Sequence, residues 1–360
     1  MKNAFTALLL TCFTLAGWAQ QKDFAILGKV VDSASRQPLL GASAFCQNTT
    51  HGTTTNQEGL FFLRLPNGGY DLVVSYMGYN KQVLRISSNQ SLADTLLIEL
   101  VKEEKAMAEV AVVASNEVAD GLSKYGSFFT EQFIGTTPNA AQCVLQNPEA
   151  LRFFYTKKRN RLKVTAKEDL LITNYALGYT IRYQLDSFSY DYNTNVSQYT
   201  GAPLFQEIDS TETMQETWTK NRAKTYLGSR LHFMRSLYDS TVIEDGFIVE
   251  KLEDDPQSVK GSIIHKLYDG EQYIADSSDV TVNWAGRYRI SYRTVLPDKR
   301  FLQEFKLPAG MKMQVTLLSL TNGFVIEENG YFYEQYDVIN TGYWAWKKLA
   351  ELLPYNYEYE

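Results

Sequence analysis

The sequence predicts a mainly β protein in two parts, a β-sandwich followed by an α+β domain in which one long helix lies on a sheet. Strand-length apolar stretches alternate with turn residues between positions 24 and 101, a pattern typical of a small antiparallel sandwich. From Tyr125 onward, tyrosines alternate with aliphatic residues at a period of two, which favours sheet. Residues 213–238 instead carry apolar side chains at helical spacing.

Turn residues divide the predicted sandwich into strands. Pro38 has no N–H to donate to a sheet, so it marks the turn after the first strand. Gly59 ends the Asn-Gln-Glu-Gly segment between two strands, where a corner with positive φ requires no Cβ. We expect strands at 26–32, 42–46, 53–55, 60–65, 70–76 and 96–100.

The order of four segments resembles the carboxypeptidase-regulatory-like domain, a transthyretin-like module found at the front of secreted and outer-membrane proteins of Gram-negative bacteria. The segments are 28–32 (GKVVD), 37–45 (QPLLGASAF), 52–61 (GTTTNQEGLF) and 69–79 (GYDLVVSYMGY). The resemblance implies a seven-stranded, prealbumin-like sandwich in an envelope protein. Such a module of about 75 residues buries only about 60% of its unfolded surface, so its modest core gains from a neighbour.

The N-terminus predicts export. Lys2 precedes an apolar run, and Gly17 and Ala19 are the small residues that a signal peptidase reads, so we expect cleavage after Ala19. A lipoprotein would use Cys12 as the acylated residue, but cleavage there would cut the apolar run in half. No later segment is long and apolar enough for a transmembrane helix. The predicted location is the periplasm or an association with the outer membrane.

The expected organisation is a signal peptide (1–19), the sandwich (24–101), a linker (102–124) and a tyrosine-rich α+β domain (125–360). Charged residues at 102–105 mark the start of the linker. The mature chain has a net charge of about −7, one Lys fewer than the full chain's −6, so it is not expected to bind nucleic acid. Cys46 and Cys143 remain after cleavage, and two free thiols are favoured over one disulfide between them.

Several segments of the second part resemble secreted Gram-negative envelope proteins that are described only by their carboxypeptidase-like regulatory domain, a resemblance that implies no chemistry. They are 147–149 (NPE), 177–179 (LGY), 218–222 (WTKNR) and 228–237 (GSRLHFMRSL). None of the three histidines begins a His-x-x-Glu pair, so the sequence predicts no zinc carboxypeptidase site. No nucleophile or nucleotide-binding motif occurs either, so we expect neither catalytic residues nor a cofactor.

The best candidates for a binding site lie on the predicted helix: Arg222, Arg230, His232 and Arg235. Guanidinium groups bind carboxylates or phosphates through paired hydrogen bonds. The alternative is that these residues tie the helix to the sheet. Tyrosine faces nearby would suit a glycan, although sheet packing also explains the abundance of tyrosine.

Two classes of function follow. The first is a non-enzymatic envelope protein that presents the sandwich as an interaction module and binds a protein partner or a glycan through its second domain. The second is an envelope hydrolase, for glycan or peptide, with two carboxylates roughly 5 to 9.5 Å apart in one cleft.

Overall fold

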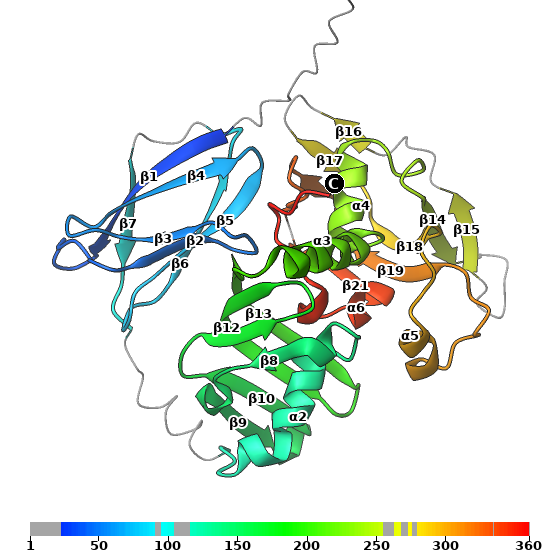
Figure 1. Cartoon of the computed structure of the whole chain (residues 1–360), viewed down its shortest axis with the longest axis horizontal. Helices are drawn as coiled ribbons and strands as arrows, with labels where there is room; N and C mark the ends of the chain where they lie inside the picture. Colours follow the sequence, from blue (N-terminus) through cyan, green and yellow to red (C-terminus); the bar gives the residue numbers. More distant parts are fainter. Residues whose placement is uncertain are drawn as a thin grey trace, which may run out of the picture.

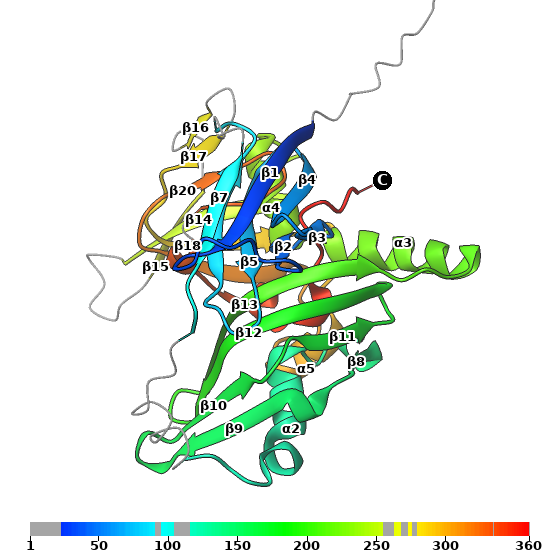
Figure 2. The same ribbon diagram turned by 90° about the vertical axis from the view of Figure 1, so that its left-hand side faces the viewer.

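The protein is mostly β, as the sequence predicts, and its strands and helices form three parts that meet at the centre of the molecule (Figures 1 and 2). The computed structural model describes residues 23–90, 95–103, 116–254, 263–267, 273–275, 279–333 and 335–359, without the side chains of 254, 263–267, 273–275 and 336. The expected signal peptide and residues 104–115 of the expected linker lie outside these residues.

The N-terminal part is a sandwich of seven strands, as predicted. One sheet has the order β4-β1-β7, and the other has the order β3-β2-β5-β6. The two inner faces enclose an apolar core that includes Val30, Tyr70 and Leu72, all fully buried. The strands are β1 (Asp23–Asp32), β2 (Ser43–Cys46), β3 (Gly52–Thr54), β4 (Leu60–Pro66), β5 (Gly69–Ser75), β6 (Gln82–Ser87) and β7 (Leu96–Leu100).

The second part, called here the middle sheet, is built on the long strand β12 (Tyr179–Asp191). β13 (Val196–Glu207) follows one edge of β12, and β10 (Arg161–Ala166) and β11 (Leu170–Asn174) share the other edge. Alternate side chains of β12 enter a core that the helix α2 (Gly121–Phe133) covers with Phe129 and Phe133. The remaining elements are η1 (Ala140–Gln142), β8 (Cys143–Leu145), η2 (Pro148–Ala150), β9 (Leu151–Thr156), η3 (Lys157–Arg159) and α3 (Glu212–Tyr226).

The third part is the C-terminal sheet, with the order β15-β14-β18-β19-β21, together with a smaller sheet of the order β16-β17-β20. The helix α4 (Arg230–Tyr238) packs on it through Phe233, Met234 and Leu237. The remaining elements are β14 (Phe247–Asp254), β15 (Ile263–Leu267), β16 (Tyr273–Ala275), β17 (Val280–Val282), β18 (Gly286–Tyr292), α5 (Lys299–Glu304), β19 (Gln314–Leu320), β20 (Phe324–Ile326), η4 (Gln335–Asp337), β21 (Val338–Gly342), α6 (Tyr343–Trp346) and η5 (Leu349–Glu351).

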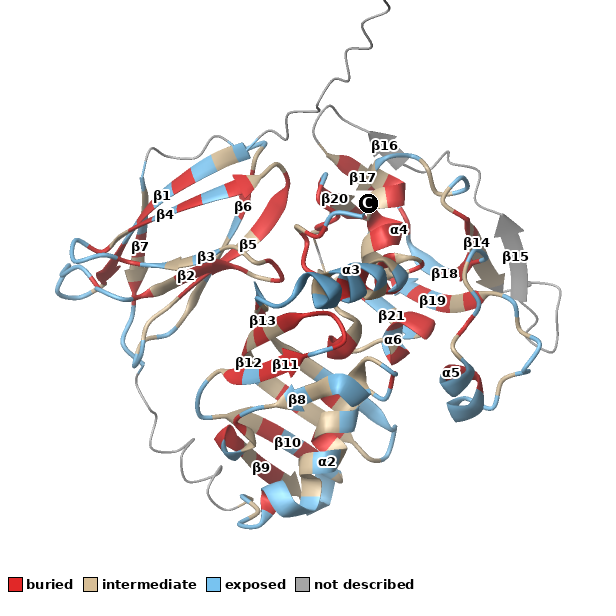
Figure 3. Ribbon diagram, in the orientation of Figure 1, coloured by how far each residue is buried: buried red, intermediate tan, exposed pale blue. Residues whose placement is uncertain are grey.

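The predicted single helix over 213–238 is two helices, α3 and α4, separated by a turn at 227–229. Gly228 has a φ of +73°, which a helix cannot contain, and a Cβ there would lie 2.5 Å from Tyr292. Ser229 then begins α4, because its hydroxyl accepts a hydrogen bond from the His232 N–H. The break places α3 beside the middle sheet and α4 on the C-terminal sheet, and each sheet has its own core (Figure 3).

Residues 116–124, which the sequence assigns to the linker, lie against the middle sheet. Val118 N–H donates to Phe153 O at 2.9 Å, and Glu117 forms an ion pair with Arg152. α2 already begins at Gly121, where a Cβ would lie 2.6 Å from the Phe153 side chain. The described part of the second region therefore begins by residue 116 rather than at 125.

The sandwich is docked against both other parts. The turn after β2 adds to the edge of β13, since Asn48 N–H donates to Pro203 O at 2.7 Å and Phe205 N–H donates to Thr49 O at 2.9 Å. On the other side, Tyr331 Oη donates to Asp71 Oδ1 at 2.9 Å. A domain as small as the sandwich buries little of its own surface, so docking against both other parts adds to the burial of its modest core.

Candidate functional site

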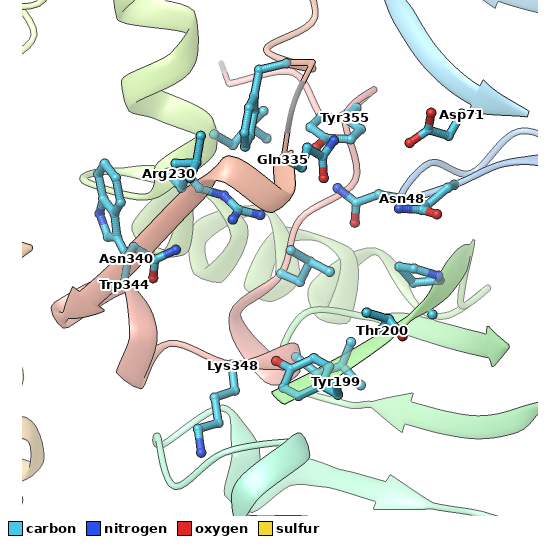
Figure 4. A pocket seen from close by; sticks show the side chains of 18 of the residues that line it. Asn48, Asp71, Tyr199, Thr200, Arg230, Gln335, Asn340, Trp344, Lys348 and Tyr355 are labelled. Carbon is cyan, nitrogen blue, oxygen red and sulfur yellow. The ribbon is translucent and has the colours of Figure 1, made fainter. Parts of the chain in front are cut away.

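A cavity of about 1160 Å³, called here the central cleft, lies where the three parts meet. β5 and β6 of the sandwich, β12 and β13 of the middle sheet, and the N-terminus of α4 with β21 and η5 all contribute to its lining. Figure 4 shows side chains from these parts around one open space. A cleft at the junction of domains, lined by aromatic and polar groups, is a common location for a ligand site.

Asn48 occupies the sandwich side of the cleft and is held there by its backbone. Its N–H donates to Pro203 O, and its carbonyl accepts from Tyr355 N–H, each at 2.7 Å. Its φ of +59° is one that asparagine tolerates better than most residues. Asn48 is only 8% exposed, and its Oδ1 has no hydrogen-bond donor among the described residues. This buried acceptor therefore lacks the hydrogen bond that such groups normally have.

Tyr355 and Tyr199 place phenol groups in the cleft from the C-terminal segment and from β13. Burial raises the pKa of both phenols, so both hydroxyls stay protonated at neutral pH. Gln335 and Asn340 add two amides to the lining (Figure 4). These groups place aromatic rings next to neutral donors and acceptors of hydrogen bonds in the lining of the cleft.

Arg230 is the first residue of α4 and lines the same cleft. Its guanidinium carbon lies 5.5 Å from the centre of the Phe332 ring. Across the described residues, no hydrogen bond or ion pair engages this guanidinium. Figure 4 shows the group projecting into the cleft, with Gln335 and Tyr355 on one side and Tyr199 on another.

The cleft has a cationic bias, although the whole chain is acidic with a net charge of −6. Five cationic side chains line it against three acidic ones, namely Lys81, Arg85, Arg230, Lys347 and Lys348 against Asp71, Asp186 and Glu351. Several of these are already paired. Lys81 forms an ion pair with Asp186, and Asp71 accepts from Tyr331. Burial raises the pKa of Asp71 and lowers that of Lys347.

A second cavity of about 720 Å³, called here the acidic cavity, lies between α4 and the C-terminal segment. It contains His232 and Arg235 beside Tyr226, and so joins two of the predicted cationic residues to a tyrosine wall. Its lining also includes five carboxylates whose proximity no sequence pattern predicts: Asp239, Glu244, Asp245, Glu328 and Glu358.

His232 is neutral in this arrangement. Its Nδ1 accepts a hydrogen bond from Gly228 N–H at 3.1 Å, so the proton of the neutral ring is on Nε2. That nitrogen lies 4.0 Å from Asp245 Oδ2. Burial lowers the pKa of His232 to about 4, and Asp245 opposes this shift only in part. At neutral pH the ring is therefore a hydrogen-bonding group and not a cation.

Arg235 ties α4 to two other segments. Its guanidinium donates to the carbonyl oxygens of Asn329, Tyr355 and Tyr357 at 3.2, 2.9 and 2.9 Å. All three bonds lead to backbone of this chain, so the group is already occupied. Arg235 thus fits the alternative that the sequence left open, a structural role for the cations of the helix.

Arg222 is also occupied, and it lines neither of the two cavities described above. Its guanidinium donates to the carbonyls of Leu177 and Gly178 at 2.7 and 3.3 Å and pairs with Glu207 at 3.2 Å. It also lies 3.9 Å from the centre of the Tyr179 ring. Within the described part of the chain, the geometry therefore leaves Arg230, among the four predicted residues, open for a ligand.

No sequence pattern indicates that Asn48, Tyr199, Gln335 and Tyr355 share a site. They lie on four segments that no motif connects. Asn48 has one local clue, because asparagine is favoured in a turn with positive φ. That clue predicts the turn and says nothing of the cleft that it faces.

Carboxylates in the acidic cavity influence one another. The pKa of Asp239 is raised, first by burial and then by the neighbouring charge of Asp245. A carboxyl group with a raised pKa can act as a general acid. The described residues hold no cluster of three or more His, Cys, Asp or Glu side chains arranged for a metal ion. Cys46 and Cys143 are both free thiols.

Comparison with known families bears on the sandwich. A family model of the CarboxypepD_reg-like domain matches residues 26–112, which include strands β1 to β7 almost entirely. The N-terminal sandwich is a CarboxypepD_reg-like domain. This confirms the resemblance that the four N-terminal segments indicated, and it gives the chain a β-sandwich module consistent with a non-enzymatic interaction role. In this protein the CarboxypepD_reg-like domain supplies one wall of the central cleft.

No curated protein matches the chain. Among solved structures, a 9R-lipoxygenase from Cyanothece PCC8801 aligns over 62% of this chain and 48% of its own, at 7% identity and a TM-score of 0.16. The aligned region is thus about half of that enzyme's length, and so low a score carries no argument about fold or activity. Among the described helices, none is long and apolar enough to cross a membrane.

Proposed function

We propose that the protein is a non-enzymatic binding protein of the cell envelope that holds a glycan in its central cleft. The observation that supports this most is the composition of the cleft, in which phenol and amide groups from three parts of the chain surround about 1160 Å³. Sugars offer apolar ring faces and many hydroxyls, which match aromatic surfaces and neutral hydrogen-bonding groups. The CarboxypepD_reg-like domain then serves as a fixed wall of the site.

The test is an array of neutral and charged envelope glycans and of peptides, probed with the purified mature chain and followed by calorimetric titration of each hit. We expect saturable binding of at least one glycan at a stoichiometry near one. Binding of peptides with no glycan bound would make the cleft a protein-interaction site. No binding on either array would remove the proposal.

Export is part of the proposal and has its own test. A positively charged residue, an apolar run and small residues at 17 and 19 support cleavage after Ala19. When the full chain is produced in a Gram-negative host, mass spectrometry of the envelope fraction should find a protein that begins at Gln20. A protein that retains Met1 in the cytosolic fraction would contradict export.

A second candidate function rests on the acidic cavity. Asp239 has a raised pKa beside Asp245, and this combination would suit a hydrolase that uses two carboxylates. Release of reducing sugars or amines from envelope glycans and peptides measures this activity. Turnover that disappears in Asp239→Asn, while binding in the central cleft persists, would establish the hydrolase and place it at a separate site.

A further inference from the structure

We propose that the ligand of the central cleft is an acidic glycan, and that Arg230 binds the carboxylate of one of its sugar units. This inference rests on the proposed function and specifies the class of ligand. In the cleft, Arg230 projects its charge into the open space, and its guanidinium has no hydrogen-bond or ion-pair partner among the described residues (Figure 4).

A half-buried guanidinium loses some of its hydrogen bonds to water, and only other acceptors can replace them. Arg222 and Arg235, on the same two helices, show how this chain satisfies such groups, since each donates to backbone carbonyls at hydrogen-bond distance. Arg230 has the Phe332 ring 5.5 Å away instead. A ring face supports the guanidinium but leaves its five N–H donors free.

The surroundings of Arg230 favour an anion over other acceptors. Its charge lowers the pKa of both Tyr199 and Tyr355, although burial outweighs this effect, so the guanidinium lies within electrostatic range of both phenols. Those hydroxyls can donate to the same anion. Of the three acidic residues that line the cleft, Asp186 pairs with Lys81, Asp71 accepts from Tyr331, and the charge of Glu351 acts on Lys347. Burial also raises the pKa of Asp71, which makes it a weaker competitor with a ligand anion for Arg230.

Asn48 adds the requirement that distinguishes a sugar acid from a simple anion. Its Oδ1 is a buried acceptor that no described residue satisfies, and a carboxylate or phosphate oxygen cannot donate to it. A sugar hydroxyl can. A uronic acid carries a carboxylate for Arg230 and hydroxyls for Asn48 in one molecule, which matches the two unsatisfied groups of the lining.

The test compares galacturonate and glucuronate oligosaccharides with the same oligosaccharides after chemical reduction of their carboxyl groups, by calorimetric titration of the mature chain. We expect the acidic forms to bind at least tenfold more tightly. Arg230→Ala should abolish this preference and leave the affinity for the reduced forms unchanged, and Arg230→Lys should retain part of it. Asn48→Gly, which tolerates the positive φ, should weaken both forms by a similar factor.

Arg159→Ala is the matched control, because it removes the same charge from an exposed position in η3. It should bind both forms as the wild type does. Equal affinity of the wild type for acidic and reduced forms would overturn the acidic ligand while the proposed glycan site stands. A preference that survives Arg230→Ala would remove Arg230 from the site. Failure of both forms and of every array glycan to bind would remove the proposed function with it.

Discussion

Replacing Arg235 with alanine should destabilise the protein without removing a ligand contact. The Arg235 guanidinium joins α4 to the turn at Asn329 and to the C-terminal segment through three hydrogen bonds to carbonyl oxygens. It also brings a positive charge to a cavity with five carboxylates. Alanine leaves the three carbonyls without this donor and the carboxylates without this counter-charge.

The magnitude follows from these contacts. A hydrogen bond to a charged group contributes about 1.5 to 3 kcal/mol when buried. Arg235 is only half-buried and lines an open cavity, so water can reach the freed carbonyls and offset part of the loss. We therefore expect the free energy of unfolding to fall by about 2 to 4 kcal/mol in total. Added salt should reduce the loss, because it screens the repulsion among the carboxylates.

Urea unfolding followed by tryptophan fluorescence measures this loss. After the expected cleavage, every tryptophan lies between residues 218 and 346, so the signal reports the middle and C-terminal sheets. Arg235→Lys should recover part of the stability, because one ammonium group reaches fewer of the carbonyls, and Arg159→Ala should change it by less than about 0.5 kcal/mol. An Arg235→Ala protein with unchanged stability and lost glycan binding would refute the structural role.

Three further predictions concern turns, pH and the thiols. Gly59→Ala should destabilise the sandwich by roughly 1 to 3 kcal/mol, and by more than Gly41→Ala does. Both glycines have positive φ, but of the two only Gly59 would bring a Cβ against backbone, 2.5 Å from Val30 O. Equal calorimetric midpoints for the two variants would contradict this prediction. Stability should fall as the pH drops from 6.5 towards about 4, because the His232 ring binds a proton in the unfolded protein but not in the folded one. Unfolding titrations at several pH values should show a loss of at most about 3 kcal/mol over this range, and a smaller loss in His232→Gln. Cys143, whose pKa burial raises to about 12, should react with a thiol reagent at pH 8 only after unfolding, and rapid labelling of the native protein would show that the thiol is accessible.

The local features of the fold could be predicted from sequence because they depend on neighbours in the chain. The alternation along Tyr179, Ile181 and Tyr183 predicts β12, and all three side chains are buried as that period requires. Gly59 has a φ of +72°, as its place in the hairpin predicts. The break between α3 and α4 also had a local signal, because a glycine followed by serine is typical of a new helix start.

The site could be predicted only in part, because its contacts join distant segments. Helical periodicity placed Arg222, Arg230, His232 and Arg235 on helical surfaces, where all four are found. It could not show which guanidinium meets a carbonyl from far along the chain, as Arg235 does at Tyr355 and Tyr357. Such contacts depend on how the sheets dock. Every residue has a backbone carbonyl, so the sequence does not indicate which carbonyls will accept a hydrogen bond from a distant guanidinium.

The most direct measurement fills each cavity with a bulky side chain in a separate variant. The glycan that binds most strongly on the array is then titrated into each variant. Thr200→Trp places an indole on the β13 wall of the central cleft, where a strand tolerates an aromatic residue, and Glu244→Trp places the same group at an exposed position of the acidic cavity. With both variants folded, as their unfolding transitions will show, we predict that Thr200→Trp abolishes glycan binding and that Glu244→Trp binds as the wild type does. Binding that survives Thr200→Trp and is lost in Glu244→Trp would contradict the central cleft as the binding site.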